Sequence, residues 1–203
     1  MKLYYSRGAC SLAAHIALYE AGLAFRAEPV DLKAKTLAGG ADFRQVNPLG
    51  YVPVLELDGG ERLTEVGVVL QYIADQKPET SLAPPAGTMP RYRLMQWLAF
   101  ISSELHKTFS PLFAPHTPED YKPVIRERLA QRLAYMNQQL AASSFLMGEQ
   151  FTVADAYLFV VLNWAGVMNL DLTPYAHLQS FQKRVGARPG VQRALQAEGL
   201  LGS

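Results

Sequence analysis

The chain has 203 residues, of which 49% are hydrophobic and 18% are charged, a composition typical of a globular protein. Its 19 basic and 18 acidic side chains leave a net charge of +1, which gives no electrostatic reason to expect nucleic acid or an anionic membrane as a partner. A single cysteine excludes an internal disulfide framework and predicts a reducing location, the cytoplasm.

The first part of the chain alternates strand and helix signals. Residues 2–5 predict a strand, and residues 11–21 predict a helix that ends at Gly22. A second, short strand is expected at residues 28–32. Residues 33–43 are ambiguous, and Gly39-Gly40 makes a continuous helix there unlikely. The element order given below nevertheless counts this stretch as the second helical element.

A hairpin and a closing helix complete this part. Residues 52–57 and 61–64 flank Asp58-Gly59-Gly60, a sequence that favours a tight turn between two strands. Residues 65–76 then predict a helix. The expected order is therefore βαβαββα, and we assign it to a domain of residues 1–77.

The remainder of the chain is predicted to be helical. Residues 78–90 contain four prolines and a glycine among small polar residues, which suits a linker. Residues 91–203 lack strand alternation and are expected to form an all-helical domain. Its most apolar stretch, residues 153–170, contains Asp155, Asn163 and Asn169, so we expect a buried core helix and no membrane span.

The only cysteine, Cys10, lies where the first strand passes into the first helix. A thiol at a helix N-terminus faces unpaired N–H groups and the positive end of the helix dipole, and both favour the nucleophilic thiolate. The alternative is that Cys10 is a buried small hydrophobic residue. Position alone leaves the two interpretations about equal.

Pro53 precedes an apolar strand in Gly50-Tyr51-Val52-Pro53-Val54. It either begins the strand in the trans form or makes a cis turn, and the element order before it favours cis. At Thr64-Glu65 a strand passes into a helix whose first N–H groups suit a carboxylate. The alternative there is that Thr64 caps the helix and Glu65 complements its dipole.

Two further patterns bear on function. Thr152 and Asp155 precede an apolar run with the spacing of a capping box, so we interpret both as structural. His106 lies late in the first helix of the second domain, and His15 lies on the apolar face of the first helix. No histidine has metal-ligand spacing with other candidate ligands, so no metal site is expected.

These motifs together resemble a cytosolic glutathione S-transferase over essentially the whole chain. The most specific stretches are residues 8–12, the Asn47-Pro48-x-Gly50-x-Val52-Pro53 segment, Thr64-Glu65 and residues 151–157. Cys10 combined with His106 resembles the bacterial beta class of that family. The resemblance implies a thioredoxin-like first domain, followed by an all-helical second domain.

The resemblance also implies a catalytic pair. Cys10 would lie beside the sulfur of glutathione, and His106 would approach the same sulfur from the helical domain. Val52, which precedes the structural Pro53, would pair its backbone with the cysteinyl unit as a short added strand.

The two ends of glutathione have implied partners as well. Glu65 and the backbone amide of Val66 would hold the γ-glutamyl end, and Lys35 would meet the glycyl carboxylate. Ser103 and Glu104 would complete the pocket. Val66 stands where the family commonly has serine, so one hydroxyl contact is lost.

The implied activity is the conjugation of glutathione, a substrate, to a small hydrophobic electrophile in an apolar cleft, by a homodimer without a metal or prosthetic group. The wall of the cleft would include Phe109, Phe113, Tyr157 and Trp164, but these are also ordinary core residues, and we favour the core interpretation. A second activity is thiol transfer or peroxide reduction through Cys10. The non-enzymatic alternative is a ligand-binding or protein-interaction module that keeps the fold and lacks the chemistry.

Overall fold

The computed structural model describes residues 1–201, and its contacts divide the chain into two compact units. The first unit consists of Met1–Ala83 together with the chain from Ala187 onward, and the second is Pro84–Gly186. Each unit is described by itself. The first holds the sheet, and the second is helical, which confirms the predicted fold class.

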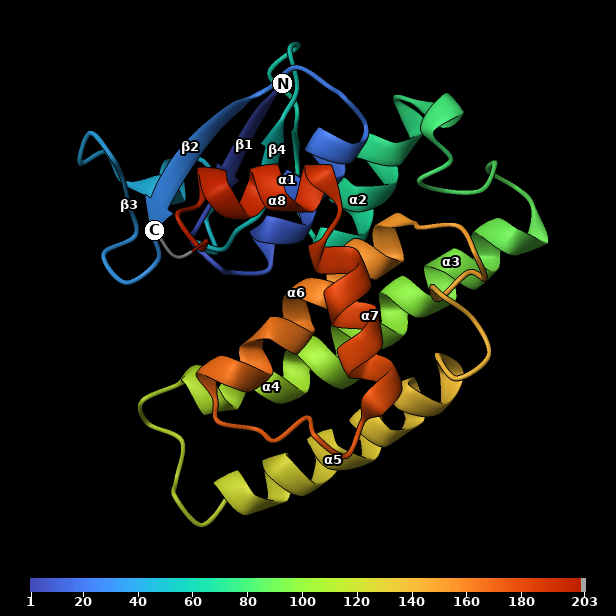
Figure 1. The fold of residues 1–203 in the computed structure, drawn as a ribbon. Helices are drawn as coiled ribbons and strands as arrows, with labels where there is room; N and C mark the ends of the chain where they lie inside the picture. Colours follow the sequence, from blue (N-terminus) through green and yellow to red (C-terminus); the bar gives the residue numbers. More distant parts are fainter. Residues whose placement is uncertain (202–203) are drawn as a thin grey trace. The chain divides into compact units, whose positions relative to one another are not determined.

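The sheet of the first unit has the strand order β3-β2-β1-β4-β5 (Figure 1). The strands are β1 (Lys2–Tyr5), β2 (Arg26–Asp31), β3 (Thr36–Leu37), β4 (Val54–Glu56) and β5 (Arg62–Leu63). β1 and β2 are parallel, and the other pairs are antiparallel. The predicted hairpin is therefore confirmed as β4 and β5, and its strands are shorter than expected.

Three α-helices of this unit are α1 (Ser11–Glu20), α2 (Val66–Asp75) and α8 (Pro189–Ala197). Helix α1 packs on β1, and α2 and α8 pack on α1. Helix α1 is buried along most of its length, and its small residues Ala13, Ala14 and Ala17 are fully buried. Small side chains allow neighbouring helices to approach closely. Figure 1 shows the red helix α8 beside the blue helix α1.

The C-terminal segment differs from the predicted domain of residues 91–203. Helix α8 belongs to the first unit, because Val191 and Ala194 are fully buried and the helix packs on α1. The helical pattern of this segment was correct. The sequence pattern did not indicate that this helix packs on α1, because an amphipathic helix does not reveal which surface it covers.

Residues 33–43 form no α-helix, so the second helix of the predicted order is wrong. They contain strand β3 and the start of the 3-10 helix η1 (Phe43–Gln45). Lys35 and Gly40 have positive φ angles of 59° and 81°, which no right-handed helix accommodates. Asp42 begins η1 by accepting a hydrogen bond from the Arg44 N–H at 2.9 Å.

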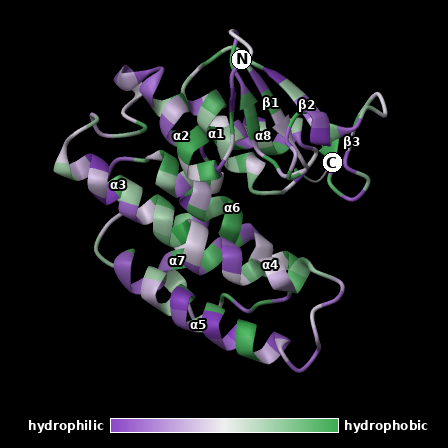
Figure 2. Cartoon of the chain, turned by 180° about the vertical axis from the view of Figure 1, so that it is seen from behind, coloured by the Kyte–Doolittle hydropathy of each residue, from purple (hydrophilic) through white to green (hydrophobic). Residues whose placement is uncertain are grey.

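The second unit consists of helical segments: α3 (Met89–Phe100), the π-helical segment η3 (Ile101–His106), α4 (Lys107–Phe113), α5 (Lys122–Gln139), α6 (Val153–Val167) and α7 (Ala176–Gly186). Helix α6 is buried on nearly every side, as expected for the most apolar stretch. In Figure 2 it is mainly green, whereas α5 alternates purple and green. Among residues 1–201, no helix is both long enough and apolar enough to cross a bilayer.

The start of α6 is held by the predicted capping box. The Thr152 N–H donates to Asp155 Oδ2 at 2.8 Å, and the reciprocal bond from the Asp155 N–H is also present. Asp155 additionally accepts a bond from the Leu146 N–H at 2.8 Å. The Asp155 side chain is fully buried, and its bond to Leu146 joins the preceding loop to the helix.

Candidate active site

Cys10 directly precedes helix α1, at the end of a turn that is fixed from within. The Ser11 hydroxyl accepts a hydrogen bond from the Ser6 N–H at 3.1 Å and lies 3.3 Å from the Ser6 carbonyl oxygen, to which it donates. Gly8 has a φ of 69°, a conformation that favours glycine. Ser11 is fully buried and therefore serves the turn, which positions the Cys10 thiol.

The Cys10 thiol lies against the segment that precedes Pro53. Its sulfur donates a hydrogen bond to the Val52 carbonyl oxygen at 3.2 Å. The Val52–Pro53 peptide bond is cis, which confirms the prediction. The structure therefore brings together two residues, 42 positions apart, that were predicted to share the site.

The protonation state of Cys10 differs from the expectation. Burial raises the pKa of the Cys10 thiol to about 12, even though the backbone N–H groups of Cys10 and Ser11 act in the opposite direction. The negative charge of Glu65 raises it further. The helix start therefore does not produce a thiolate in this state, because desolvation outweighs the exposed amides.

Glu65 begins helix α2 in an unusual backbone conformation. Its φ is 64° and its ψ is 119°, and its side chain is exposed. Glu65 is the N-cap residue, without a side-chain cap, so the predicted capping by Thr64 is not formed. The amides of Val66 and Gly67 open the helix, where N–H groups have no intrahelical acceptor.

Lys35 lies against the same loop as Val52. Its ammonium group donates to the Gly50 carbonyl oxygen at 2.9 Å and is 5.3 Å from the centre of the Tyr51 ring. Gly50 is buried with a φ of 64°, and a Cβ at this position would lie 2.9 Å from the Lys35 side chain. The loop thus connects Lys35 to Val52 and, through Val52, to Cys10.

His106 is the last residue of the π-helical segment in the second unit. Its Nδ1 atom is 2.6 Å from the Tyr157 hydroxyl of α6, and its ring centre is 4.8 Å from that of Trp164. Burial, and secondarily the charge of Lys107, lowers the pKa of His106 to about 4. The imidazole is therefore neutral at physiological pH.

Ser103 and Glu104, which were predicted to complete the pocket, have hydrogen-bond partners within the second unit. The Glu104 carboxylate accepts hydrogen bonds from Arg132 at 2.8 Å and Arg128 at 3.5 Å, both on α5. These arginines lower the pKa of Glu104 below its usual range. The exposed Ser103 donates to the Ala99 carbonyl oxygen at 3.0 Å. Glu104 therefore has a structural ion pair that the sequence did not indicate.

The four candidate cleft residues are divided by burial. Phe109 and Tyr157 are fully buried and Trp164 is nearly so, whereas Phe113 is 45% exposed. The Trp164 ring contacts Phe109 and Phe113 edge-on, with centres 5.9 Å and 5.5 Å apart. Three of the four are thus core residues, and one edge of this aromatic cluster reaches the surface.

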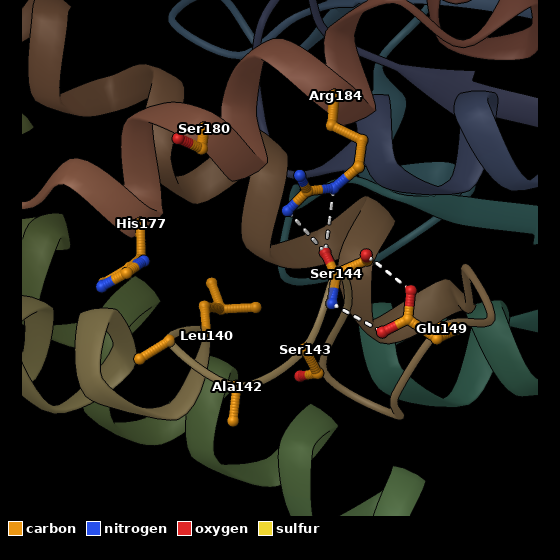
Figure 3. A pocket seen from close by; sticks show the side chains of 9 residues that line it. Leu140, Ala142, Ser143, Ser144, Glu149, His177, Ser180 and Arg184 are labelled. Atoms are coloured by element: carbon orange, nitrogen blue, oxygen red, sulfur yellow. Dashed lines mark hydrogen bonds between the residues drawn. The ribbon is translucent and has the colours of Figure 1, made fainter.

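A hollow elsewhere in the second unit holds none of the predicted site residues (Figure 3). Its volume is about 280 Å³. Arg184 donates to the Ser144 carbonyl oxygen at 2.9 Å, and the Ser144 hydroxyl donates to Glu149 at 2.7 Å. These polar groups already bind one another. Within residues 1–201, no cluster of three potential metal ligands is found.

Tyr157 contacts His106, a pairing that the sequence does not indicate. It was considered only as a cleft or core residue, yet it is the hydrogen-bond partner of His106. The two residues are 51 positions apart, and no local pattern links them, because packing of α6 against η3 is a tertiary event.

Comparisons with known proteins agree with this arrangement. Residues 8–76 match the model described as "Glutathione S-transferase, N-terminal domain", and residues 100–189 match "Glutathione S-transferase, C-terminal domain". Glutathione S-transferase GstA of Escherichia coli O157:H7 is 48% identical over 200 residues, covering 98% of this chain and 100% of that protein. The chain therefore belongs to the glutathione S-transferase family and is an enzyme of that kind.

Solved structures place its similarity within the family. BphK, a bacterial glutathione transferase in a ternary complex, is 56% identical with a TM-score of 0.97, covering 98% of this chain and 100% of that one. A sphingomonad enzyme complexed with glutathione and the beta-class enzyme of Sphingomonas chungbukensis are each 47% identical, with TM-scores of 0.96, covering 99% of this chain and 100% of theirs. The similarity to the bacterial beta class confirms the prediction.

Proposed function

We propose that this enzyme joins glutathione to small hydrophobic electrophiles, with glutathione lying along the loop that holds Val52. The observation that carries the proposal is the placement of the Cys10 sulfur 3.2 Å from the Val52 carbonyl oxygen, beside a cis-proline. Val52 would pair its backbone with the cysteinyl unit of glutathione, so that the substrate sulfur lies next to Cys10.

The charges of the first unit suit the two ends of glutathione. Lys35, which lies against the same loop, would bind the glycyl carboxylate as an ion pair. The first amides of α2, that of Val66 included, would bind the γ-glutamyl carboxylate, and the exposed Glu65 would accept bonds from the adjacent amino group. The sphingomonad relative was solved with glutathione, which supports this assignment.

The proposed reaction begins with the loss of the glutathione thiol proton to solvent. The resulting thiolate forms a bond to the electrophilic carbon, and the leaving group departs with its electron pair. The enzyme would contribute orientation and hydrogen bonds to the thiolate. On the basis of the family resemblance, we assign one of these bonds to the imidazole of His106 and a further glutathione contact to Ser103. The ion pairs of Glu104 with α5 argue for a structural role for this residue.

Thiol transfer through Cys10 is a second proposed activity, supported by the same short contact with Val52. The Cys10 thiolate would attack the glutathione sulfur of a mixed disulfide between glutathione and a second thiol, forming a Cys10–glutathione disulfide and releasing the second thiol as its thiolate. A second glutathione would then attack the Cys10–glutathione disulfide, which regenerates Cys10 and releases glutathione disulfide. The chain has no other cysteine to resolve the intermediate.

We further propose a cytoplasmic homodimer. Helix α3 has exposed apolar side chains at a spacing of three residues, Met89, Tyr92 and Met95, which are 65%, 55% and 42% exposed. Such a row suits a protein partner. Light scattering should give about twice the chain mass of 22.4 kDa. A monomer at every concentration would contradict the dimer.

Retention on immobilised glutathione tests the binding site. We expect wild-type protein to be retained, and both Lys35→Ala and Glu65→Ala to weaken retention. Lys33→Ala and Glu61→Ala are matched controls, because these side chains carry the same charges and are exposed outside the proposed contacts. Equal retention of all four variants would contradict the assigned contacts, and no retention of the wild type would contradict the proposed binding.

A further inference from the structure

We propose that Glu198 is a positioning residue for Cys10, and that the turn that ends helix α8 sets how far the Cys10 thiol is open to attack. All the groups involved belong to the first unit. The proposal concerns the thiol in the absence of glutathione, so it goes beyond the proposed function and does not depend on it.

Helix α8 ends in a turn whose shape the sequence favours. Gly199 has a φ of 66°, and its N–H donates to the Gln196 carbonyl oxygen at 2.9 Å. The Leu200 N–H donates to the Leu195 carbonyl oxygen at 2.8 Å. These two bonds form a Schellman motif, in which glycine is preferred at the residue with the positive φ. The motif reverses the direction of the chain directly after Glu198.

Three consecutive residues of this reversal contact the turn that precedes helix α1. The Glu198 carboxylate accepts a hydrogen bond from the Gly8 N–H at 2.8 Å. The Gly199 carbonyl oxygen accepts one from the Arg7 guanidinium. The Leu200 side chain packs on the same turn, where a Cβ on Gly8 would lie 3.6 Å from it. Arg7 and Gly8 are therefore held to the C-terminal segment by polar and apolar contacts.

The Glu198 carboxylate is itself anchored to the body of helix α1. Its other oxygen lies 2.9 Å from Nδ1 of His15, and the side chains of Glu198 and His15 are 0% and 1% exposed. The rings of Tyr5, Tyr19 and Phe25 surround His15, with centres 5.2, 5.2 and 5.4 Å from its own. Closely packed interior groups have little freedom to move. One carboxylate thus links the rigid part of α1 to the turn.

This link determines the environment of the Cys10 sulfur. The thiol donates to the Val52 carbonyl oxygen at 3.2 Å, and burial raises its pKa to about 12. Without the bond between Glu198 and Gly8, the turn loses one of its fixed points, and the thiol is free to leave the Val52 oxygen for solvent. The backbone N–H groups at the start of α1 then favour the thiolate, because desolvation no longer opposes them.

The test is alkylation of the full-length protein by iodoacetamide, followed by intact mass spectrometry across neutral and alkaline pH without glutathione. Glu198→Ala breaks the link and should raise the alkylation rate at neutral pH about tenfold for each unit by which the thiol pKa falls. Glu198→Gln keeps an oxygen for the Gly8 N–H and should return the rate toward that of the wild type. Circular dichroism at each pH identifies the conditions in which every variant is folded.

Arg7→Ala is a second variant, which leaves the buried pair intact and removes the exposed bond to the Gly199 carbonyl oxygen. Loss of a positive charge near the thiol would by itself raise its pKa, so faster alkylation reports a released turn. Arg193→Ala is the matched control, since the Arg193 guanidinium also joins α8 to α1 but lies over the Tyr19 ring, 4.5 Å from its centre. Val191→Ala controls for lost stability, because it weakens the packing of α8 at a fully buried side chain.

We expect both controls to be alkylated at the wild-type rate. A wild-type rate in folded Glu198→Ala would overturn the proposal, and so would an equal rise in Val191→Ala. If Glu198→Ala does not fold, Arg7→Ala decides the question. A rate above that of Arg193→Ala then supports the proposal, and an equal rate overturns it.

Discussion

His15 of helix α1 and Glu198 at the end of α8 form a buried pair, with Nδ1 and Oε1 2.9 Å apart and side chains 1% and 0% exposed. The other Glu198 oxygen accepts the Gly8 N–H at 2.8 Å, two residues before Cys10. The Arg7 guanidinium also donates to the Gly199 carbonyl oxygen. The C-terminal segment therefore holds the turn that carries the thiol.

Removal of Glu198 should destabilise the first unit. Glu198→Ala leaves the buried His15 Nδ1 and the Gly8 N–H without this acceptor, and each buried group left unsatisfied costs about 1–3 kcal/mol. Glu198→Gln retains one acceptor oxygen and should cost less. The free energy of unfolding in urea measures both, with the exposed Gln196→Ala as control. Wild-type stability in Glu198→Ala would show that the pair contributes nothing.

The burial of His15 was predictable from the sequence, but its hydrogen-bond partner Glu198 was not. The place of His15 on an apolar face indicated a core or domain-interface histidine, because local periodicity reports burial, and its side chain is indeed buried. Its acceptor lies 183 residues away, and nothing local marks Glu198 as different from an exposed glutamate. For the same reason, α8 was predicted as a helix but assigned to the wrong domain.

The capping box of α6 should act on stability alone. Thr152→Ala removes a cap and should lower the free energy of unfolding by about 0.5–2 kcal/mol, whereas Thr152→Ser keeps the hydroxyl and should lose less. Asp155→Ala should cost more, because Asp155 also holds the Leu146 N–H. Turnover per folded molecule should match the wild type in all three variants. Lost turnover at unchanged stability would reverse this assignment.

Asp155 should also make stability depend on pH. Burial raises its pKa from 3.8 to about 6, so the folded state holds this proton more tightly than the unfolded state. The associated stability is fully present below pH 3.8 and is lost as the pH rises through about 6, a change of about 3 kcal/mol. Asp155→Asn cannot titrate. The stability difference between wild type and Asp155→Asn should therefore decline from pH 4 to pH 6, and a constant difference would contradict the raised pKa.

The candidate site was predictable to the extent that its residues carry local signals. The cis-proline and the strand-to-helix junction at Cys10 each have such a signal, and the structure contains both. The π-helical segment does not, because its residues fit an ordinary α-helix in sequence. The prediction that the helix start favours a Cys10 thiolate was wrong for a related reason. The sequence shows the helix start but not the burial, which raises the thiol pKa more than the helix amides lower it.

The Cys10 thiol should react slowly with alkylating reagents. With a pKa of about 12, little thiolate exists at neutral pH, so alkylation by iodoacetamide should be slow without glutathione. The rate should rise about tenfold for each pH unit in the range where the protein stays folded. Mass spectrometry of the intact chain measures the adduct directly. Rapid alkylation at neutral pH with little pH dependence would show that the amides of α1 stabilise the thiolate after all.

Glutathione disulfide should add one glutathione to the chain, and a reductant should remove it. Cys10→Ala should abolish this adduct, because no other cysteine exists. Conjugation should fall only partially in Cys10→Ala, since the Val52 backbone, Lys35 and the start of α2 still bind the substrate. Ser11 cannot replace the thiol, because its buried hydroxyl is bonded to both backbone groups of Ser6. An adduct that persists in Cys10→Ala would place the modification on another residue, and full loss of conjugation would make Cys10 essential to that reaction as well.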